Sequence, residues 1–393
     1  MTLNKEKIFA DTPGKKNFIH LNNAGSSLMP RPVLDAQIAH LKLEAIIGGY
    51  EAMADKKDQI DEVYKSVAKL ISASSDEIAL VENATVGWAM GFYAIDFKPG
   101  DRILTVEAEY ASNYLAYLHM ARSKGVIIDV IPSDEHGDLK LDMLEAMIDE
   151  KVKLISATHV PTNSGLVNNI CALGKIAKKH NILYQVDACQ SAGQMPLDVE
   201  EIGCDLLSAT SRKYLRGPRG IGFLYARKSV IEKLHPPIID LKSAKWLSDH
   251  EYELRHDAKR FENWEFNYAA VLGLGVAVDY ALDIGLENIR QRNNELADYL
   301  RHRLTEIKNI IPHTLSKNQC AIVTFWVKNH KAADIVNALR KHHINTSVSE
   351  PGSTLLDATK NHLPNLVRTS LHYYNDEVEI DNFIEILKKI IIS

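Results

Sequence analysis

The sequence predicts an α/β protein in two parts: a large domain with a mostly parallel sheet between helices, and a smaller C-terminal α+β domain. Short runs rich in β-branched residues alternate with amphipathic stretches between residues 74 and 225. This alternation is typical of parallel strands that helices cover on both faces. A polar, charged stretch over residues 242–260 then interrupts the pattern, and long helical patterns follow it.

The first part contains seven predicted strands, each a short apolar run between polar or turn-forming residues. They are Glu77–Val81, Arg102–Val106, Val126–Ile131, Lys153–Thr158, Leu183–Asp187, Leu206–Ala209 and Gly222–Tyr225. Helical patterns between them cover Asn113–Ser123, Leu141–Ile148 and Ala172–His180. Ligands of such sheets bind beyond the carboxyl ends of the strands, so we expect the chemistry in the loops that directly follow the strands.

The second part begins with two long helical patterns, Tyr268–Ile284 and Leu286–Lys308. A strand-like run, Ala321–Val327, precedes a helix over Ala332–His342, and a last helix covers Glu377–Ile391. We therefore divide the chain into an N-terminal arm (residues 1–20), a large domain (21–265), and an interdomain helix with a small C-terminal domain (266–393).

Composition excludes several classes of function. The 46 Lys and Arg residues against 51 Asp and Glu residues leave a formal charge of −5, which argues against general nucleic-acid binding. The apolar runs are too short to span a bilayer, and the first sixteen residues, MTLNKEKIFADTPGKK, lack the apolar stretch of a secretion signal. The four cysteines are widely spaced, which fits a reducing compartment. We expect a soluble cytoplasmic protein with no membrane or nucleic-acid partner.

Common cofactor and catalytic signatures do not occur: there is no GxGxxG, P-loop, GxSxG or HExxH segment. The residues His250, Glu251 and His256 superficially resemble metal ligands. The two histidines are six positions apart and would not share a helical face, so we predict no metal site.

A carboxylate and an amide follow one predicted strand in the segment YQVDACQSAG. Asp187 ends the strand and Gln190 comes three residues later. A carboxylate at this point could hold a positive charge on a bound heterocycle. The alternative is a helix N-cap, because Asp commonly caps a helix that follows a strand.

Two further segments place anion-binding groups after strands. In TSRKYLRGPRG the hydroxyl of Thr210 precedes Arg212 and Lys213, which could bind an anion and supply a nucleophilic amine; the alternative is a solvated basic loop. In ENATVGWAM, Ala84 and Thr85 lie between a strand and a helix, where free backbone N–H groups bind phosphate; the alternative is an ordinary Thr cap.

Together these segments resemble the pyridoxal-phosphate enzymes of the class-V aminotransferase family, and especially its cysteine desulfurase and selenocysteine lyase branch. Four other segments share the order and spacing of that family: IHLNNAGSSLMP (Ile19–Pro30), EYASN (Glu109–Asn113), THVPTNSG (Thr158–Gly165) and VRTSLHYYND (Val367–Asp376). Proteins similar to isopenicillin N epimerase share these motifs. The resemblance covers nearly the whole chain and implies the fold-type I architecture, pyridoxal 5′-phosphate as cofactor, and a homodimer.

The resemblance also implies three catalytic residues. Lys213 matches the lysine that forms the internal aldimine, and the neighbouring Arg212 with partial desolvation should lower its pKa. Asp187 matches the carboxylate that pairs with the pyridine nitrogen, which makes the ring an electron sink. Tyr110 occupies the place of the aromatic residue stacked on the ring, where the family usually has His.

The remaining matched positions concern binding. Arg368 matches the arginine that holds the substrate α-carboxylate, a bidentate task that suits a guanidinium, and Asn23 is a second candidate for substrate binding. Gln190 matches the partner of the cofactor's phenolic oxygen. The other cofactor-binding positions are Ala84, Thr85, Thr162, Thr210 and Arg212, the last standing where desulfurases usually carry His.

Three features depart from the family pattern. Desulfurases that store sulfur as a persulfide carry a loop cysteine shortly before the arginine, and SVSEPGSTLLDATKNHLPNLVR has none. Cys189 is expected to be a small packing residue. FENWEFN places Trp264 and Glu265 where the family often has Gly-Thr, so we expect them to line the substrate pocket or the dimer seam. Arg216 and Arg219 could meet a second anionic group or the partner subunit, or be solvent-exposed.

We therefore predict a pyridoxal-phosphate enzyme that acts on an L-amino acid through an external aldimine. The missing loop cysteine favours a carbon–sulfur β-elimination lyase. An amino-acid epimerase and an aminotransferase are the alternatives, because shared ancestry does not determine the reaction type. A non-catalytic scaffold is disfavoured because Lys213 and Asp187 are both present, and a nicotinamide dehydrogenase because the glycine fingerprint does not occur.

Overall fold

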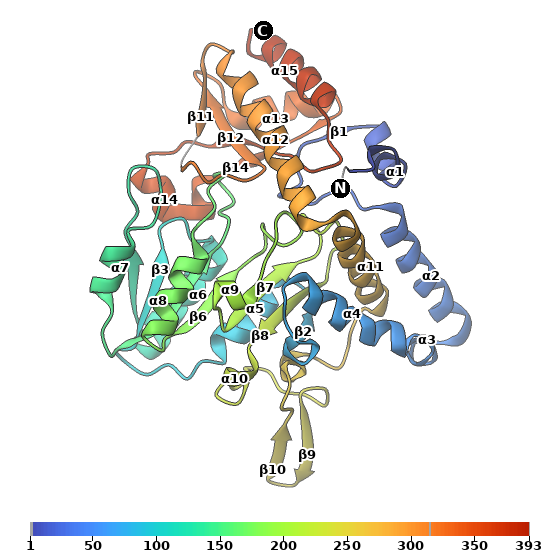
Figure 1. The fold of residues 1–393 in the computed structure, drawn as a ribbon, viewed down its shortest axis with the longest axis vertical. Coiled ribbons are helices and arrows are strands. Elements are labelled where there is room, and N and C mark those ends of the chain that lie inside the picture. Colours follow the sequence, from blue (N-terminus) through green and yellow to red (C-terminus); the bar gives the residue numbers. More distant parts are fainter. Residues whose placement is uncertain (1–2, 314–315, 393) are drawn as a thin grey trace.

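The computed structural model of the chain describes residues 3–313 and 316–392, and a seven-stranded sheet forms its centre (Figure 1). The strand order is β2-β8-β7-β6-β5-β3-β4. Their bounds are β2 (Ile78–Val81), β3 (Arg102–Val106), β4 (Ile127–Ile131), β5 (Val152–Thr158), β6 (Leu183–Asp187), β7 (Leu206–Thr210) and β8 (Gly222–Ala226). Strand β8 runs antiparallel to β2 and β7, and the other neighbours are parallel, so the predicted mostly parallel sheet is confirmed.

Each of the seven predicted strands is observed within one residue of its predicted ends. Their side chains alternate between two cores, as the period of two requires. Leu206, for example, belongs to a core with α5 (Ala84–Tyr93) and α6 (Ala111–Lys124), whereas Leu207 belongs to a core on the other face. Because helices cover both faces, every residue of β2, β7 and β8 is buried.

The core on the second face packs helices from distant parts of the sequence. Its helices are α4 (Lys57–Leu70), α7 (Leu141–Met147), α8 (Ile170–Lys179), α9 (Val199–Ile202) and α11 (Tyr268–Ile284). Helix α11 contacts both α4 and α2 (Arg31–Ile47), so it packs on the large domain although it begins the predicted second part. No single helix among the described residues is long and apolar enough to cross a membrane; α11 and α12 together pass that test only as a pair bent by 78°.

The C-terminal part has its own antiparallel sheet and its own core. The sheet runs β11 (Ile310–His313), β12 (Ile322–Val327), β15 (Leu366–Ser370) and β14 (Ser347–Ser349). Helices α12 (Leu286–Thr305), α13 (Ala332–Lys341) and α15 (Glu377–Ile392) contribute the apolar side chains that pack on it. Strand β1 (Ile19–His20) pairs with β13 (Ile344–Asn345), so the N-terminal segment joins this part. The predicted division at residues 20 and 265 stays a prediction.

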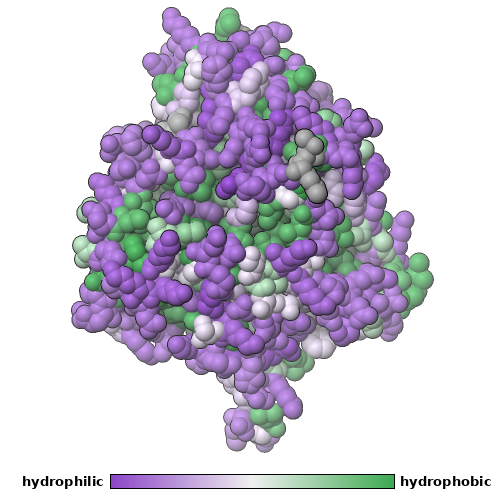
Figure 2. Space-filling model, viewed as in Figure 1, coloured by the Kyte–Doolittle hydropathy of each residue, from purple (hydrophilic) through white to green (hydrophobic). Residues whose placement is uncertain are grey.

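Several elements had no predicted counterpart. The segment before β2 forms α1 (Lys5–Ala10), α2, α3 (Gly49–Asp55) and α4, and α10 (Lys228–Ile231) follows β8. The stretch expected to be a break contains a hairpin, β9 (Ala244–Ser248) and β10 (Glu251–Leu254), which projects from the body (Figure 1). Trp246 in this hairpin is 74% exposed, so no buried face gave the segment a readable apolar period. Figure 2 shows a mostly hydrophilic surface on this side.

Candidate active site

The ends of four strands meet at one edge of the central sheet. Thr158 ends β5, Asp187 ends β6 and Thr210 ends β7, and the register pairs Thr158 with Asp187 and Asp187 with Ser208. Strand β2 runs in the same direction as β7, because both are antiparallel to β8, so α5 and its first residue Ala84 begin at this edge too. The predicted position of the site beyond the carboxyl ends of the strands agrees with this arrangement.

Lys213 lies in the loop after β7 with its side chain partly buried. Burial is the main cause that lowers its pKa, and the charges of Arg212 and Arg368 lower it further, while Cys189 and Asp187 oppose the shift. Its Nζ makes no hydrogen bond or ion pair within residues 3–313 and 316–392. An amine with a lowered pKa and no partner is suited to nucleophilic attack on an aldehyde.

Asp187 is buried and accepts hydrogen bonds from two amides. Its Oδ1 accepts from the Cys189 backbone N–H at 2.9 Å and its Oδ2 from Nδ2 of Asn113 at 3.1 Å. It does not cap a helix, because the next helix, α9, begins at Val199 and is capped by Asp198. Within the described part of the chain no cation pairs with this carboxylate, so it can hold a positive charge of a ligand.

An anion-binding corner lies where α5 meets β7. Thr210 pairs with Gly222, and a Cβ added to Gly222 would lie 3.3 Å from the backbone nitrogen of Ala84. The side chain of Asn83 caps α5 by accepting from Val86 N–H at 3.0 Å. The backbone N–H groups of Ala84 and Thr85 make no hydrogen bond within the described residues, so they can bind a phosphate.

Two arginines add positive charge near this corner. Burial lowers the pKa of Arg212, and the like charge of Arg219 lowers it further. Arg212 donates to the Gly25 carbonyl, which ties the N-terminal segment to the lysine loop. Neither guanidinium has a carboxylate partner in residues 3–313 and 316–392, which favours an anionic ligand.

Arg368 reaches the site from β15 of the C-terminal sheet. Its Nε donates to the Ser347 hydroxyl at 3.1 Å, and its Nη1 donates to the hydroxyl of Thr162 and, at 3.4 Å, to the Thr162 carbonyl. Burial lowers its pKa, and the charge of Arg212 lowers it further. No carboxylate of the described residues pairs with it, so this guanidinium can bind the carboxylate of a substrate.

The amide of Gln190 connects the same region to the N-terminal segment. Its Nε2 donates to the Ala24 carbonyl at 3.2 Å and to the Thr162 hydroxyl at 3.5 Å. Its Oε1 is buried without a hydrogen-bond partner. Buried polar atoms rarely stay unpaired in native proteins, so this amide has capacity for a ligand.

Tyr110 precedes α6 and is 37% exposed. Its phenol opposes the lowering of the pKa of both Arg212 and Arg368, which places it close to the two cations. Its backbone N–H donates to the Glu109 carboxylate at 2.9 Å and to the Thr158 hydroxyl at 3.3 Å. An exposed aromatic face at this point can cover a planar ligand.

Asn23 has no free polar atom. It is fully buried, its Nδ2 donates to the Ser370 carbonyl at 2.7 Å, and its Oδ1 accepts from the Tyr374 hydroxyl. The predicted substrate contact of Asn23 stays a prediction, and in this structure the side chain joins the N-terminal segment to the end of β15.

Arg216, whose role the sequence left open, is buried inside the protein and not exposed to solvent. It is 1% exposed and donates to the Leu28 carbonyl at 2.8 Å, the Tyr373 hydroxyl at 2.8 Å and the Thr12 hydroxyl at 2.7 Å. Its guanidinium also lies 4.4 Å from the ring centre of Tyr374. Arg216 therefore fixes the N-terminal segment against the lysine loop, whereas Arg219 is exposed.

Trp264 and Glu265 line a surface cavity of about 630 Å³ together with Leu41 and Tyr50. Trp264 is 51% exposed, and its backbone N–H donates to Asp240 at 2.6 Å. Their predicted place in a substrate pocket or dimer seam stays a prediction.

His256, in the segment after β10, contacts the Glu232 carboxylate at 2.9 Å. No group of three metal-ligating side chains occurs among the residues that the structure describes.

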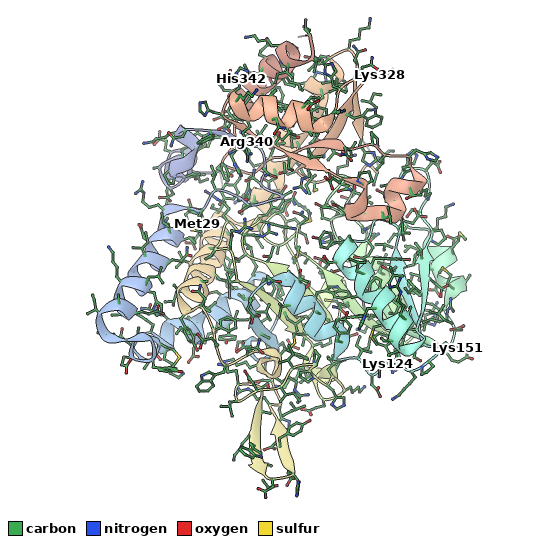
Figure 3. The ribbon with its side chains drawn as sticks, turned by 180° about the vertical axis from the view of Figure 1, so that it is seen from behind. Met29, Lys124, Lys151, Lys328, Arg340 and His342 are labelled. Atoms are coloured by element: carbon green, nitrogen blue, oxygen red, sulfur yellow. The ribbon has the colours of Figure 1, made fainter. Side chains whose placement is uncertain are left out.

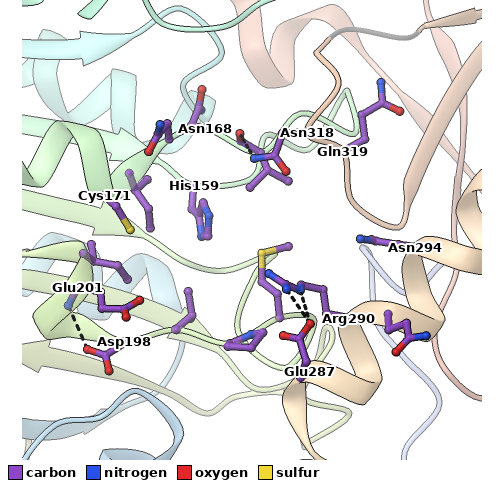
Figure 4. Close-up of a pocket in the computed structure, with 18 of the residues that line it drawn as sticks. His159, Asn168, Cys171, Asp198, Glu201, Glu287, Arg290, Asn294, Asn318 and Gln319 are labelled. Atoms are coloured by element: carbon purple, nitrogen blue, oxygen red, sulfur yellow. Dashed lines mark hydrogen bonds and ion pairs between the residues drawn. The ribbon is translucent and has the colours of Figure 1, made fainter.

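A separate cavity of about 760 Å³ lies between α8, α9 and α12, with His159 at its wall (Figure 4). None of the predicted cofactor-binding residues lines it. The cations labelled in Figure 3 also lie away from the sheet edge: Lys124 and Lys151 lie at the far side of the large domain, and Arg340 lies on the C-terminal part. These features therefore do not contribute to the candidate site.

Two further residues of the EYASN segment, Glu109 and Asn113, belong to the site although the sequence pattern alone assigned them no role. Both are buried, and Nδ2 of Asn113 contacts Glu109 and Asp187. An acid three residues after the end of β3 and four residues before an amide was a usable signal, because this spacing brings both to one side of a helix start.

The residues present fit pyridoxal 5′-phosphate. Lys213 can react with an aldehyde, Asp187 can face a protonated ring nitrogen, and the unpaired Oε1 of Gln190 marks capacity beside the ring. The α5 N-terminus and Arg212 can hold a phosphate.

Comparisons with known proteins identify the family of this chain. The family model described as aminotransferase class-V matches residues 19–383. A probable cysteine desulfurase from Synechocystis sp. is 31% identical, with 94% of this chain and 90% of that protein covered. Another from Methanothermobacter thermautotrophicus is 28% identical, with 98% of each chain covered.

Solved structures show the same fold. An apo cysteine desulfurase from Thermococcus onnurineus NA1 superposes with a TM-score of 0.90 at 28% identity, over 99% of this chain and 98% of that one. A cystine C–S lyase in complex with cysteine persulfide gives a TM-score of 0.86 at 22% identity, over 96% of this chain and 99% of that one, and shows the fold alone. The chain belongs to the class-V aminotransferase family and is a pyridoxal-phosphate-dependent enzyme of that family.

Proposed function

We propose that this protein is a carbon–sulfur lyase that cleaves the Cβ–S bond of an L-amino acid of the cysteine type by β-elimination. The observation that carries the proposal is that Arg368 and Lys213, neither of which pairs with a carboxylate of the described residues, lie close enough for their charges to interact. An arginine that holds the substrate carboxylate places the substrate's Cα within reach of the lysine. The relatives named as cysteine desulfurases support a sulfur amino acid as substrate.

Each of the candidate site residues then has a defined task. Pyridoxal phosphate, when bound, supplies an electron sink for negative charge at the substrate's Cα. Lys213 would take the Cα proton on one face, because burial lowers the pKa of its amine and so favours the uncharged form that accepts a proton. Asp187 would keep the ring nitrogen of the bound cofactor protonated, and Tyr110 would cover the ring. Arg368 orients the substrate through its carboxylate.

The cysteines do not favour a persulfide intermediate on this chain. Cys204 and Cys320 are buried, and Cys171 and Cys189 are partly exposed. Burial raises the pKa of Cys189 well above its usual range, and the charge of Asp187 adds to the shift. A thiol that stays protonated is a poor nucleophile toward sulfur. We therefore propose that the sulfur leaves as a free product.

The segment before Arg368 is held against the large domain. Nδ2 of Asn163 donates to the Glu350 carbonyl at 3.0 Å and to the Thr354 hydroxyl at 2.9 Å. Lys360 in α14 (Leu355–Lys360) pairs with Glu107 at 2.7 Å. A fixed segment without a thiol agrees with elimination better than with sulfur transfer from a mobile loop.

Product analysis tests the proposal. With L-cysteine, β-elimination takes up one water and yields pyruvate, ammonia and sulfide in equal amounts. Sulfur transfer to an acceptor thiol yields alanine instead. We expect pyruvate and sulfide in a one-to-one ratio without added thiol; alanine as the main product would overturn the lyase proposal.

The two alternatives are outcomes of the same assay. An epimerase would exchange the Cα hydrogen for deuterium with inversion and without pyruvate, and it would need a second acid on the face opposite Lys213. An aminotransferase would give a keto acid that retains the sulfur.

We also propose a homodimer whose contact includes the outer face of α2. Leu34, Ile38 and Leu41 are 42%, 40% and 54% exposed and follow a helical spacing, so they form an apolar stripe. This stripe leads to the cavity lined by Tyr50 and Trp264. Light scattering should give a dimer for the wild type and a monomer for Leu41→Glu.

The four unpaired cysteines support a cytoplasmic location.

A further inference from the structure

Two buried carboxylates in the site share one side-chain amide. Nδ2 of Asn113 donates to Oε1 of Glu109 at 2.9 Å and to Oδ2 of Asp187 at 3.1 Å. A primary amide nitrogen carries two hydrogens, so both are used. Glu109 on one side of the amide therefore helps to determine that Asn113 presents its Nδ2, and not its Oδ1, to Asp187 on the other side.

Glu109 is a buried loop acid that accepts an unusually large number of hydrogen bonds. It follows β3, is 3% exposed, and has no cationic partner among the described residues. Five hydrogen bonds converge on its two oxygens, from the Thr105 hydroxyl, the Tyr110 N–H, the Asn113 amide, the Thr158 N–H and the Thr158 hydroxyl. A carboxylate buried at this cost needs such donors, and the cluster thereby fixes its position.

Glu109 contacts Tyr110 and, through Asn113, Asp187, the two residues proposed to lie at the face and at the edge of the cofactor ring. Its Oε1 accepts from the backbone of Tyr110, the residue proposed to cover the ring face. The same oxygen accepts from Asn113, which contacts Asp187 at the proposed place of the ring nitrogen. One carboxylate thus ties together the two residues that would contact the ring from its face and from its edge.

We infer that Glu109 is a positioning residue for the cofactor ring: through Asn113 it aims a donor at Asp187, and through the Tyr110 backbone it sets the ring cover. This inference rests on the proposed cofactor role of Asp187. Without the Glu109 carboxylate, the Asn113 amide can rotate and present its oxygen to Asp187. Two acceptors would then face each other, and the carboxylate at the ring nitrogen would lose its orientation.

The electrostatics of the pair agree with this arrangement. Burial raises the pKa of Glu109 to about 7, and the charge of Asp187 contributes to the shift. The two carboxylates therefore interact across the Asn113 bridge, as the hydrogen bonds indicate.

The test compares cofactor binding by Glu109→Gln and Asn113→Leu with a matched control, Glu107→Gln, which removes an acid from the same loop that pairs with the exposed Lys360. We measure the dissociation constant for pyridoxal phosphate and the visible circular dichroism of the bound cofactor. Both Glu109→Gln and Asn113→Leu should weaken binding about tenfold or more and change the dichroism, because a hydrogen bond to a charged group is lost. Glu107→Gln should match the wild type.

Kinetics and a double variant separate positioning from general damage. We expect kcat to fall while KM for the amino acid changes little, since Arg368 is untouched. The double variant Glu109→Gln/Asn113→Leu should lose less affinity for the cofactor than the sum of the losses of the two single variants, because both substitutions remove the same Asn113 bridge. Thermal unfolding of the cofactor-free proteins identifies any loss of fold, and if Glu109→Gln does not fold, Asn113→Leu decides alone.

Wild-type affinity and dichroism for Asn113→Leu would overturn the inference. Strictly additive effects of the two substitutions would do so as well. Failure of the wild type to bind pyridoxal phosphate, or to be labelled at Lys213 after borohydride reduction, would contradict the proposed function itself, so the two failures are distinguishable.

Discussion

Arg368 of the C-terminal sheet donates a hydrogen bond to the side chain of Thr162, which belongs to the loop after β5 of the large domain. The two residues are 206 positions apart in the sequence. Gln190 donates to the same Thr162 hydroxyl at 3.5 Å. The candidate carboxylate-binding group is therefore joined to the candidate cofactor site by a single threonine, and the relative position of the two parts of the chain determines the shape of the substrate site.

Replacing the lysine should remove the chemistry and leave the fold. For Lys213→Ala we expect no turnover and no covalent attachment of the cofactor after borohydride reduction, because no other amine replaces it. The matched control is Lys124→Ala, an exposed lysine on α6. Mass spectrometry of the reduced proteins checks the attachment; turnover retained by Lys213→Ala would refute the assigned nucleophile.

Replacing the candidate carboxylate-binding arginine should act on substrate binding. Arg368→Ala should weaken the binding of the amino acid by about 2–5 kcal/mol, as for a truncated buried charge pair, and raise KM more than it lowers kcat. Arg368→Lys should recover only part of the loss, since an ammonium cannot bind a carboxylate through two parallel N–H bonds. Arg340→Ala, on the exposed side of α13, is the control; an unchanged KM for Arg368→Ala across a panel of amino acids would contradict the assignment.

Arg216 and Arg219 lie in one loop and should respond in opposite ways. Arg216→Leu should lower the free energy of unfolding by about 3 kcal/mol, because the Thr12 and Tyr373 hydroxyls lose their buried partner. Arg219→Leu should change it by no more than about 0.5 kcal/mol, since that side chain is exposed. Urea unfolding measures both, and equal effects would show that Arg216 does not hold the N-terminal segment.

The pH dependence of stability should carry a contribution from His159. Burial lowers its pKa to about 4, so below pH 6.5 the unfolded chain binds a proton that the folded protein does not accept until about pH 4. The His159 contribution is therefore complete above pH 6.5 and is lost as the pH falls toward 4, at up to about 1.4 kcal/mol per pH unit.

The comparison with His159→Gln isolates this contribution from other groups. Glu109 acts in the opposite direction, because its raised pKa adds stability as the pH falls from 7. In a series of urea unfolding curves between pH 4 and 7, the wild type should lose stability relative to His159→Gln as the pH decreases. If the free energy of unfolding changed with pH in the same way for the two proteins, His159 would not be buried in its neutral form.

Most of the central sheet could be predicted from the sequence, because each strand carries its own signal. The run Leu183–Asp187 is apolar and ends in a carboxylate, and both the strand and its last residue are observed as predicted. The hairpin β9–β10 could not be predicted in this way. Its side chains are exposed on both faces, so the pairing of the two strands left no apolar alternation to detect.

The candidate site divides along a similar line. Lys213 and Asp187 lie in short segments whose spacing was informative, and the structure brings their charges close enough to interact. The roles of Arg216 and Glu109 were not readable. Arg216 has its partners in the N-terminal segment and after β15, and Glu109 acts through an amide that contacts a residue 74 positions further along the chain.

The order of residues by itself thus determined the strands, the family resemblance and the candidates for the reactive groups, because local periodicity and short motifs are properties of neighbouring positions. The tertiary structure decided which cations are buried and which are free, and which carboxylates share a donor. Burial and hydrogen bonding depend on chain segments that meet only after folding, and these contacts set the charge state and orientation of each group.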